Sequence, residues 1–140
     1  MKKILITGAS GFIGQRLVNS TNDTVELTVL SRSKGNKFRT IECDLEKDSI
    51  PINSLKGIDT VFHLAGFSHD FRKTDALESV YWKINVDATV SLANLAVKSN
   101  VRRFVFVSSV KAGGRPPLGL YAGEECQGVP EGVYGKTKRE

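Results

Sequence analysis

Short apolar runs rich in β-branched residues alternate along this chain with stretches of helical periodicity. Each run has the length of one buried strand, and this alternation is typical of βαβ units that build a parallel sheet. Five strands are predicted in this way, at Lys2 to Thr7, Val25 to Leu30, Lys37 to Cys43, Asp59 to Leu64 and Arg103 to Ser108.

Two stretches between these strands have helical patterns. Phe12 to Asn19 is predicted as the first crossover helix, and Thr74 to Asn100 contains the longest pattern, with Leu92 and Leu95 on its apolar face. Because crossovers between parallel strands are right-handed, we expect an α/β fold, a doubly wound parallel (Rossmann) sheet in the order 3-2-1-4-5. Its ligand crevice should lie at the carboxyl ends of the strands.

The segment Val110 to Gly132 departs from this alternation. It contains six glycines and three prolines and has little periodicity, so it is predicted as a long loop. Residues Val133 to Glu140 then have the pattern of the first turns of a helix.

A glycine-rich turn, Thr7-Gly8-Ala9-Ser10-Gly11-Phe12-Ile13-Gly14, joins the first strand to the first helix. Gly8 can take the positive φ of a tight turn, Gly11 lets the backbone approach a pyrophosphate, and Gly14 allows close packing of helix on strand. The free N–H groups and the positive end of the helix dipole would face the phosphates. In this context the three glycines predict a dinucleotide-binding site, with one residue more between the first pair than the commoner fingerprint has.

Composition adds limits to this picture. With 140 residues, of which 40% are hydrophobic, the chain has the size and apolar content of one domain with one core. The first apolar run stops at Gly8, too early for a secretory signal, and no other stretch is long enough to span a membrane. We therefore expect a soluble, cytoplasmic protein without a membrane partner.

The net charge of +5 does not by itself indicate a nucleic-acid partner, because the basic residues form no run and do not alternate with aromatic residues. We expect no nucleic acid among the partners. Cys43 and Cys126 lie far apart, in no metal-binding or redox spacing, and are interpreted as structural or incidental. No metal site is predicted.

Tyr134 and Lys138 are four residues apart and therefore share one face of the predicted final helix. An ammonium group beside a phenol favours the ionised phenol, which can exchange a proton with a substrate hydroxyl. An ordinary amphipathic helix start has the same spacing, so the pair alone leaves both interpretations open. Ser108 and Ser109 end the fifth predicted strand, where a hydroxyl can hydrogen-bond a reacting oxygen or cap a turn.

Several motifs, taken together and in this order, resemble the extended short-chain dehydrogenase/reductase family, the NAD-dependent epimerases and dehydratases that act on nucleotide sugars. The resemblance covers nearly the whole chain. Besides the glycine-rich turn it rests on His63-Leu64-Ala65-Gly66, Asn85-Val86, Phe104-Val105-Phe106-Val107-Ser108-Ser109 and Tyr134-Gly135-Lys136-Thr137-Lys138.

The resemblance implies roles for individual residues. Ser109 and Tyr134 would be the catalytic hydroxyls, and Lys138 would bind the nicotinamide ribose and assist Tyr134. His63 is expected to be packed rather than catalytic, while His69 lies where the family places a substrate-side loop. Asp44 and Leu45 would lie near the adenine, Ala65 and Gly66 beside the ribose or phosphates, and Asn85 would order the neighbouring site. The implied cofactor-binding residues are these five together with Gly8, Gly11, Phe12, Ile13, Gly14, Ser31, Arg32 and Lys138.

The cofactor is predicted as NADP or NAD, with NADP favoured. The second predicted strand is followed by Ser31-Arg32-Ser33-Lys34, where NAD-selective proteins of this fold place a carboxylate. A cation and two hydroxyls suit the 2′-phosphate of NADP. The alternative is an exposed charged turn that also tolerates NAD.

The dehydratases of the family have an Asp-Glu pair after the strand-five hydroxyl, whereas Val110-Lys111 follows Ser109 here. The resemblance therefore implies a nucleotide-sugar 4-epimerase or 4-keto reductase of the kind that serves bacterial surface-polysaccharide synthesis. Hydride would be transferred at sugar C4 and Tyr134 would carry the proton. The alternative is a cofactor-binding remnant or sensor without turnover.

Members of the family are longer and add further strands and a smaller C-terminal domain that holds the nucleotide-sugar substrate. We therefore expect residues 1–140 to be the N-terminal portion of an NAD(P)-binding Rossmann domain, as a fragment or a natural truncation, with the substrate domain absent. Two points stay open: whether these residues alone are active, and whether they form a homo-oligomer.

Overall fold

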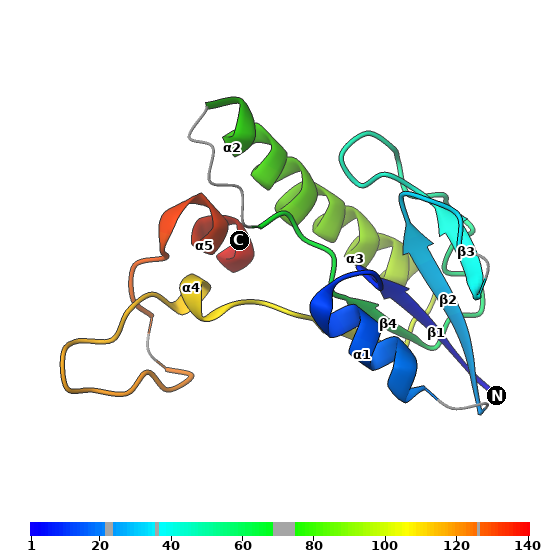
Figure 1. Cartoon of the computed structure of the whole chain (residues 1–140), viewed down its shortest axis with the longest axis horizontal. Coiled ribbons are helices and arrows are strands. Elements are labelled where there is room, and N and C mark those ends of the chain that lie inside the picture. Colours follow the sequence, from blue (N-terminus) through cyan, green and yellow to red (C-terminus); the bar gives the residue numbers. More distant parts are fainter. Residues whose placement is uncertain (22–23, 36, 69–74, 126) are drawn as a thin grey trace.

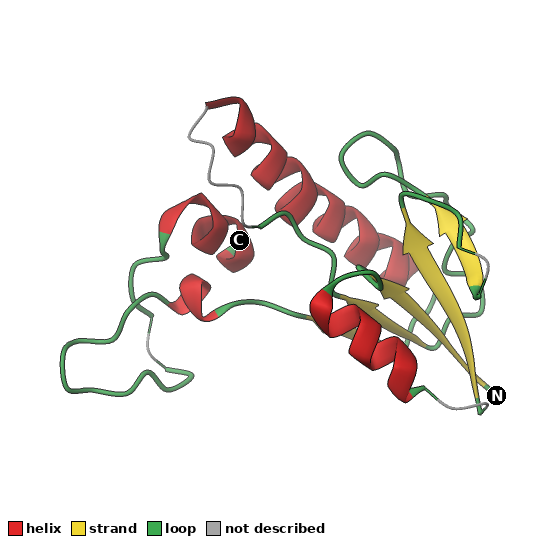
Figure 2. Ribbon diagram, in the orientation of Figure 1, coloured by secondary structure: helices red, strands yellow, loops and turns green. Residues whose placement is uncertain are grey.

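The computed structural model describes residues 1–21, 24–35, 37–68, 75–125 and 127–140. These residues form one sheet of five parallel strands in the order β3-β2-β1-β4-β5, with helices packed around it (Figure 1, Figure 2). The predicted doubly wound Rossmann sheet and its strand order are confirmed. The strands are β1 (Lys2–Thr7), β2 (Val25–Ser31), β3 (Arg39–Glu42), β4 (Thr60–His63) and β5 (Arg103–Phe106).

The predicted bounds of β3 and β5 were too wide. The edge strand β3 begins at Arg39 rather than at Lys37, because it pairs only with the end of β2, from Thr28 to Ser31. The strand β5 ends at Phe106, since its pairing with β4 ends where β4 itself ends, at His63. The chain beyond each strand end is therefore free to turn towards the carboxyl edge of the sheet.

The long predicted helix is divided in the middle. Five residues at its centre, Lys83–Asp87, form a π-helical turn, η1. Thr74, with which the prediction began, lies outside the described residues. Within the described part of the chain, none of the helices has the length and apolar character that crossing a membrane requires. The remaining helices are α1 (Phe12–Ser20), α2 (Asp75–Trp82), α3 (Ala88–Lys98), α4 (Val110–Gly113) and α5 (Gly132–Arg139).

Apolar residues bury both faces of the sheet. Side chains alternate along a strand, so Leu5 and Ile6 of β1 point to opposite faces. Leu5 packs in a cluster with Leu92 of α3, and Ile6 packs in a second cluster with Val18 of α1. Helix α1 and the α2-to-α3 rod therefore cover different faces, which leaves the carboxyl ends of the strands as the open edge.

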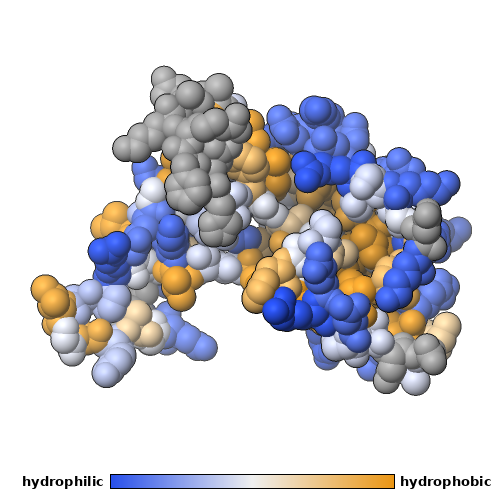
Figure 3. All heavy atoms as spheres, in the orientation of Figure 1, coloured by the Kyte–Doolittle hydropathy of each residue, from blue (hydrophilic) through white to orange (hydrophobic). Residues whose placement is uncertain are grey.

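The segment predicted as one long loop contains a short helix, α4, at its start. Ser109 caps this helix, because its side-chain oxygen accepts a hydrogen bond from the Lys111 N–H at 3.3 Å. The rest of the segment is irregular, and its two ends are joined by a bond from the Gly128 N–H to the Gly113 carbonyl at 2.8 Å. Its tip exposes Leu118, Leu120 and Tyr121, and apolar atoms are visible at that end of the molecule in Figure 3.

Candidate functional site

The glycine-rich turn after β1 leaves no room for side chains at two of its glycines. Gly8 has a φ of +71°, and a Cβ there would lie 2.6 Å from the Ala65 nitrogen. A Cβ on Gly14 would lie 2.1 Å from the Gly8 carbonyl oxygen. Gly11 is different, because its Cβ would approach only that same oxygen, at 3.3 Å. Gly8 and Gly14 thus permit the close packing of the turn, while Gly11 is left on its outer side.

A cavity of about 370 Å³ opens beside this turn, at the carboxyl ends of the strands. It lies where doubly wound sheets bind their ligands. Its lining combines residues from the ends of β1, β2, β3 and β4. Of the predicted cofactor-binding residues it brings together Gly8, Gly11, Ser31, Arg32, Asp44, Leu45, Ala65 and Gly66.

Five predicted cofactor-binding residues do not line this cavity. Phe12 is 75% exposed at the start of α1, with the Arg16 guanidinium 3.7 Å from its ring centroid, and Ile13 is exposed beside it. Gly14 is buried beneath the turn. The other two, Asn85 and Lys138, are buried farther along the site.

Asp44 lines the cavity and also shapes the turn after β3. Its Oδ1 accepts a hydrogen bond from the Glu46 N–H at 3.0 Å, and its carbonyl oxygen accepts one from the Asp48 N–H at 2.7 Å. The thiol of Cys43, beside it, is buried, and burial raises its pKa, with Asp48 and Asp44 adding to the effect. Cys43 is therefore a protonated core residue. Cys126 lies outside the described residues.

His63 connects the glycine-rich turn with α3. Register pairs it with Thr7 in the sheet, and its Nδ1 lies 2.7 Å from the Thr7 hydroxyl. Its Nε2 lies 2.8 Å from the Thr89 hydroxyl, which donates to the Asn85 carbonyl oxygen. Burial, with a smaller contribution from Lys138, lowers the pKa of His63 to about 4. His63 is packed, as predicted.

These contacts assign one tautomer to the neutral ring. Because the Thr89 hydroxyl donates its proton to Asn85, it must accept from His63, so Nε2 carries the hydrogen. Nδ1 then accepts from Thr7, whose oxygen accepts in turn from the Ala65 N–H at 3.1 Å. The chain of bonds runs in one direction from Ala65, at the cavity wall, to the π-helical turn.

The Asn85 side chain joins the loop after β4 to the last helix. Its Oδ1 accepts from the Phe67 N–H at 2.7 Å, and its Nδ2 donates to the Phe67 carbonyl oxygen and to the Thr137 hydroxyl. The Thr137 hydroxyl donates a hydrogen bond to the Tyr134 carbonyl oxygen at 3.2 Å. Asn85 therefore uses its whole amide to hold two segments together, which is a positioning arrangement.

Helices α4 and α5 pack closely, and Gly135 makes this contact possible. A Cβ at Gly135 would lie 2.4 Å from the Lys111 carbonyl oxygen, and that same oxygen accepts from the Glu131 N–H at 2.9 Å. The close approach places Ser109, the cap of α4, on the element that packs against the Tyr134 helix. Tyr134 is half-buried, and its ring meets the Tyr81 ring edge-on at a centroid distance of 6.4 Å.

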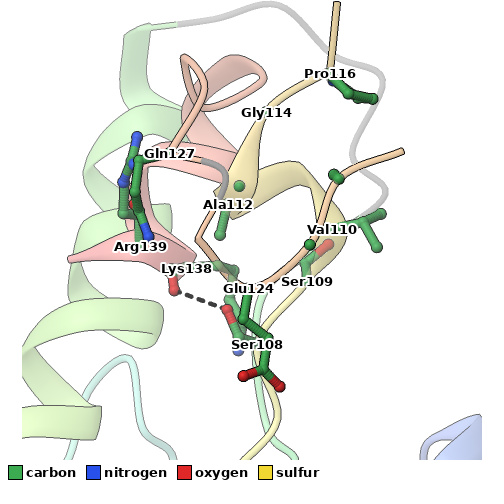
Figure 4. A pocket seen from close by; sticks show the side chains of 13 residues that line it. Ser108, Ser109, Val110, Ala112, Gly114, Pro116, Glu124, Gln127, Lys138 and Arg139 are labelled. Carbon is green, nitrogen blue, oxygen red and sulfur yellow. Dashed lines mark hydrogen bonds between the residues drawn. The ribbon is translucent and has the colours of Figure 1, made fainter. Parts of the chain in front are cut away.

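Lys138 lines one cavity and lies near a residue of the other. It is only 5% exposed and lines a second cavity of about 840 Å³, together with Ser108 and Ser109 (Figure 4). Its Nζ would be 3.8 Å from a Cβ built on Gly66, which lines the first cavity. The Ser108 hydroxyl donates to its carbonyl oxygen at 3.1 Å. Lys138 thus lines the second cavity, and its ammonium lies close to Gly66, a residue that lines the first.

The Lys138 ammonium also lies 4.1 Å from the centroid of the Phe106 ring. Burial lowers the pKa of Lys138 to about 8. The ring contact, and the roles of Thr7 and Thr89, were not predicted from the sequence. A Phe on an alternating strand is typical of an ordinary core residue. Only its place two residues before Ser108 could have pointed to the site. His69 lies outside the described residues.

The sequence places the chain among known enzymes. Residues 4–140 match the NAD dependent epimerase/dehydratase family. The chain is 33% identical over 150 residues to the UDP-glucose 4-epimerase of Vibrio cholerae, covering 99% of this chain and 44% of that protein. The chain spans about half the length of the curated relatives it matches.

Solved structures agree with this result. A short-chain dehydrogenase/reductase superfamily protein from Agrobacterium tumefaciens, with bound NAD, has a TM-score of 0.85 and 27% identity, covering 97% of this chain and 42% of that one. The UDP-N-acetylglucosamine 4-epimerase from Bacillus cereus has a TM-score of 0.78 and 28% identity, covering 99% and 45%. The family match covers nearly the whole chain and the fold agrees with it, and the chain therefore belongs to the NAD dependent epimerase/dehydratase family.

Proposed function

We propose that this chain is the cofactor-binding and proton-transferring part of a UDP-sugar 4-epimerase or 4-keto reductase. The observation that carries the proposal is the position of Lys138, which lines the cavity beside Ser109 and brings its ammonium close to Gly66 in the lining of the cavity beside the glycine-rich turn. Hydride transfer between a dinucleotide and a sugar requires the two to meet, and a cation placed there can act on both. The epimerases among the relatives support the choice of substrate class.

The residues present fit a dinucleotide. The turn at Gly8 and Gly14 excludes every side chain from its packed side, and Gly11 leaves the backbone open to a phosphate. Asp44 and Leu45 would hold the adenine end, and Ala65 and Gly66 the ribose and phosphates. A bound nicotinamide would supply reversible hydride exchange with the sugar carbon.

The proton chemistry falls to the helix pair α4 and α5. Ser109 and Tyr134 would hydrogen-bond the sugar C4 oxygen, and Tyr134 would take the hydroxyl proton as the carbonyl forms and return it later. The Lys138 ammonium would bind the ribose. Val110 and Lys111 follow Ser109 where the dehydratases of the family have an acidic pair, which disfavours elimination of water.

Replacement of Tyr134 by Phe tests this assignment. The protein is expressed from its complete reading frame and assayed with UDP-glucose or UDP-N-acetylglucosamine and NAD(P). We expect Tyr134→Phe to lower turnover by at least about 100-fold, because general acid–base catalysis contributes that much, while cofactor affinity stays close to the wild-type value. The matched control is Tyr121→Phe in the exposed loop, which should retain full activity. An active Tyr134→Phe protein would contradict the assignment, and a wild-type protein that binds cofactor without turnover would support the sensor alternative.

We propose further that NADP is preferred over NAD. Ser31 and Arg32 line the first cavity, and an adjoining cavity of about 440 Å³ adds Ser33, Lys34 and Lys37. These cations and hydroxyls would surround a 2′-phosphate without an opposing carboxylate at the end of β2.

Calorimetric titration with NADP and NAD tests this preference. Arg32→Gln should weaken NADP binding about tenfold, as expected for loss of one charge-assisted bond, and leave NAD binding nearly unchanged. Lys83→Gln is the matched control for loss of one positive charge, because Lys83 is exposed and lines neither of these two cavities. Equal affinities of the wild-type protein for the two cofactors, or tighter binding of NAD, would remove the proposal.

A further inference from the structure

The Lys138 side chain reaches its position through a largely buried path, which raises the question of what holds its charge there. Its residue is 5% exposed, and burial alone disfavours the ammonium form. The contact observed at its nitrogen is aromatic, since the Phe106 ring centroid lies 4.1 Å away. A cation at this distance is attracted by the negative face of the ring.

The Phe106 ring is itself in contact with a second ring. It stacks on the His63 imidazole at a centroid distance of 5.9 Å and an interplanar angle of 25°. His63 is fully buried and hydrogen-bonded at both ring nitrogens, to Thr7 and to Thr89. The imidazole therefore cannot rotate without breaking two bonds, and the Phe106 ring has a rigid surface to lie on.

We propose that Phe106, stacked on His63, is a positioning residue that holds the Lys138 ammonium close to Gly66. Phe106 touches neither substrate nor cofactor in this proposal and acts through Lys138. The proposal rests on the proposed function, because it gives the Lys138 position its purpose. It also explains why the strand end next to Ser108 carries a ring rather than an aliphatic side chain.

The neutral state of His63 matters for this arrangement. His63 of β4 is the titratable group that stacks on the Phe106 ring, and a charged imidazole there would repel the nearby Lys138 ammonium. A second ring proton would sit on Nδ1, but Nδ1 already accepts a hydrogen bond from the Thr7 hydroxyl. Of Lys138, Phe106 and His63, the Lys138 ammonium is then the group that carries the positive charge.

Substitution of the ring, read out by the Lys138 side chain itself, tests the proposal. The Lys138 methylene protons next to the ammonium are followed by NMR in the 140-residue chain, with Lys138→Gln used to assign them. In the wild-type protein they should resonate upfield, because they lie over the ring. Phe106→Leu should abolish this upfield displacement and lower the Lys138 pKa further, by about 0.5 to 1, since the attraction is lost and the burial remains. Phe106→Tyr should retain both properties.

Phe104→Leu is the matched control. It removes a ring from the same strand that also lies near His63, at 6.1 Å between ring centroids, but no contact with Lys138 is shown for it in the described part of the chain. This variant should leave the Lys138 signals in place. Unchanged Lys138 signals in Phe106→Leu, or equal changes in Phe104→Leu, would overturn the proposal.

A graded substitution decides the matter if Phe106→Leu does not fold. Incorporation of mono- and trifluorinated phenylalanine at position 106 keeps the shape of the ring and weakens its negative face in steps. The Lys138 pKa should then fall in the same order, and a pKa that ignores the series contradicts the proposal. These measurements need no turnover, so a failure of the proposed enzymatic function would appear in the Tyr134→Phe assay and not here.

Discussion

His63 shows how one buried polar side chain can be satisfied completely. Both ring nitrogens have hydroxyl partners, and the direction of each bond follows from the next one in the chain. Burial without a partner would cost about 1 to 3 kcal/mol per polar group. The sequence motif predicted a packed histidine, but its partners Thr7 and Thr89 lie 56 and 26 residues away, and such distant pairs follow only from register and helix placement.

The free energy of unfolding should therefore depend on His63 at acid pH. The pKa of His63 is lowered from 6.5 to about 4 in the folded protein, so the unfolded chain gains a proton first as the pH falls. The stability present above pH 6.5 is lost as the pH falls towards 4, by about 3 kcal/mol. His63→Gln, which cannot ionise, should lack this loss, and urea unfolding at pH 7 and at pH 4 measures it.

The control for this measurement is a buried residue that does not titrate. Leu92→Ala should lower the free energy of unfolding by about 2 to 5 kcal/mol through loss of packing, and by a similar amount at both pH values. If the difference between the wild-type protein and His63→Gln is the same at pH 7 and pH 4, then His63 is protonated in the folded protein as easily as in the unfolded one.

At the scale of elements, the strands and α1 could be predicted from periodicity, but α4 could not. The segment after β5 is rich in glycine and proline, and four helical residues are too few for a periodic signal. What forms α4 is local, the cap by Ser109, together with its contact to α5 through Gly135. The π-helical turn could not be predicted for another reason, because Ile84, Ala88 and Leu92 are spaced four residues apart, which also fits an uninterrupted α-helix.

The α4 to α5 contact should be sensitive to a single methyl group. Gly135→Ala places a Cβ 2.4 Å from the Lys111 carbonyl oxygen, so the two helices must separate. We expect a loss of about 1 to 3 kcal/mol in the free energy of unfolding, as for other overpacked sites, and a lower turnover because Ser109 and Tyr134 move apart. Denaturant unfolding and the epimerase assay measure the two effects.

Gly123→Ala is the matched control, because a Cβ on Gly123 meets nothing within 4 Å. Its stability should stay within about 0.5 kcal/mol of the wild-type value. A Gly135→Ala protein that is as stable and active as Gly123→Ala would show that the contact between the helices is looser than the structure describes.

At the scale of the whole molecule, the side-chain amide of Asn85 connects two parts of the structure. The sheet with α1 and α3 forms the larger part, and the segment from Ser108 to Arg139 lies beside it (Figure 1). Asn85 connects the second part to the first through Thr137, and the bond from Ser108 to the Lys138 carbonyl joins the two ends of the second part. Resemblance to a family indicated that Asn85 orders the site. Its partners could not be predicted, because they depend on where α5 packs against the π-helical turn.

Asn85→Asp should loosen this connection without unfolding the sheet. A carboxylate still accepts from the Phe67 N–H but cannot donate to the Phe67 carbonyl or to Thr137, and it is buried. Two lost bonds at a buried site should speed amide exchange in α5 at least about tenfold, since opening of α5 becomes easier by about 1 to 3 kcal/mol. Hydrogen exchange followed by mass spectrometry compares α5 with β1 and β4. Thr137→Ser keeps the hydroxyl and should exchange as the wild-type protein does. If β1 and β4 accelerate as much as α5 in Asn85→Asp, Asn85 stabilises the whole fold and the two parts do not open separately.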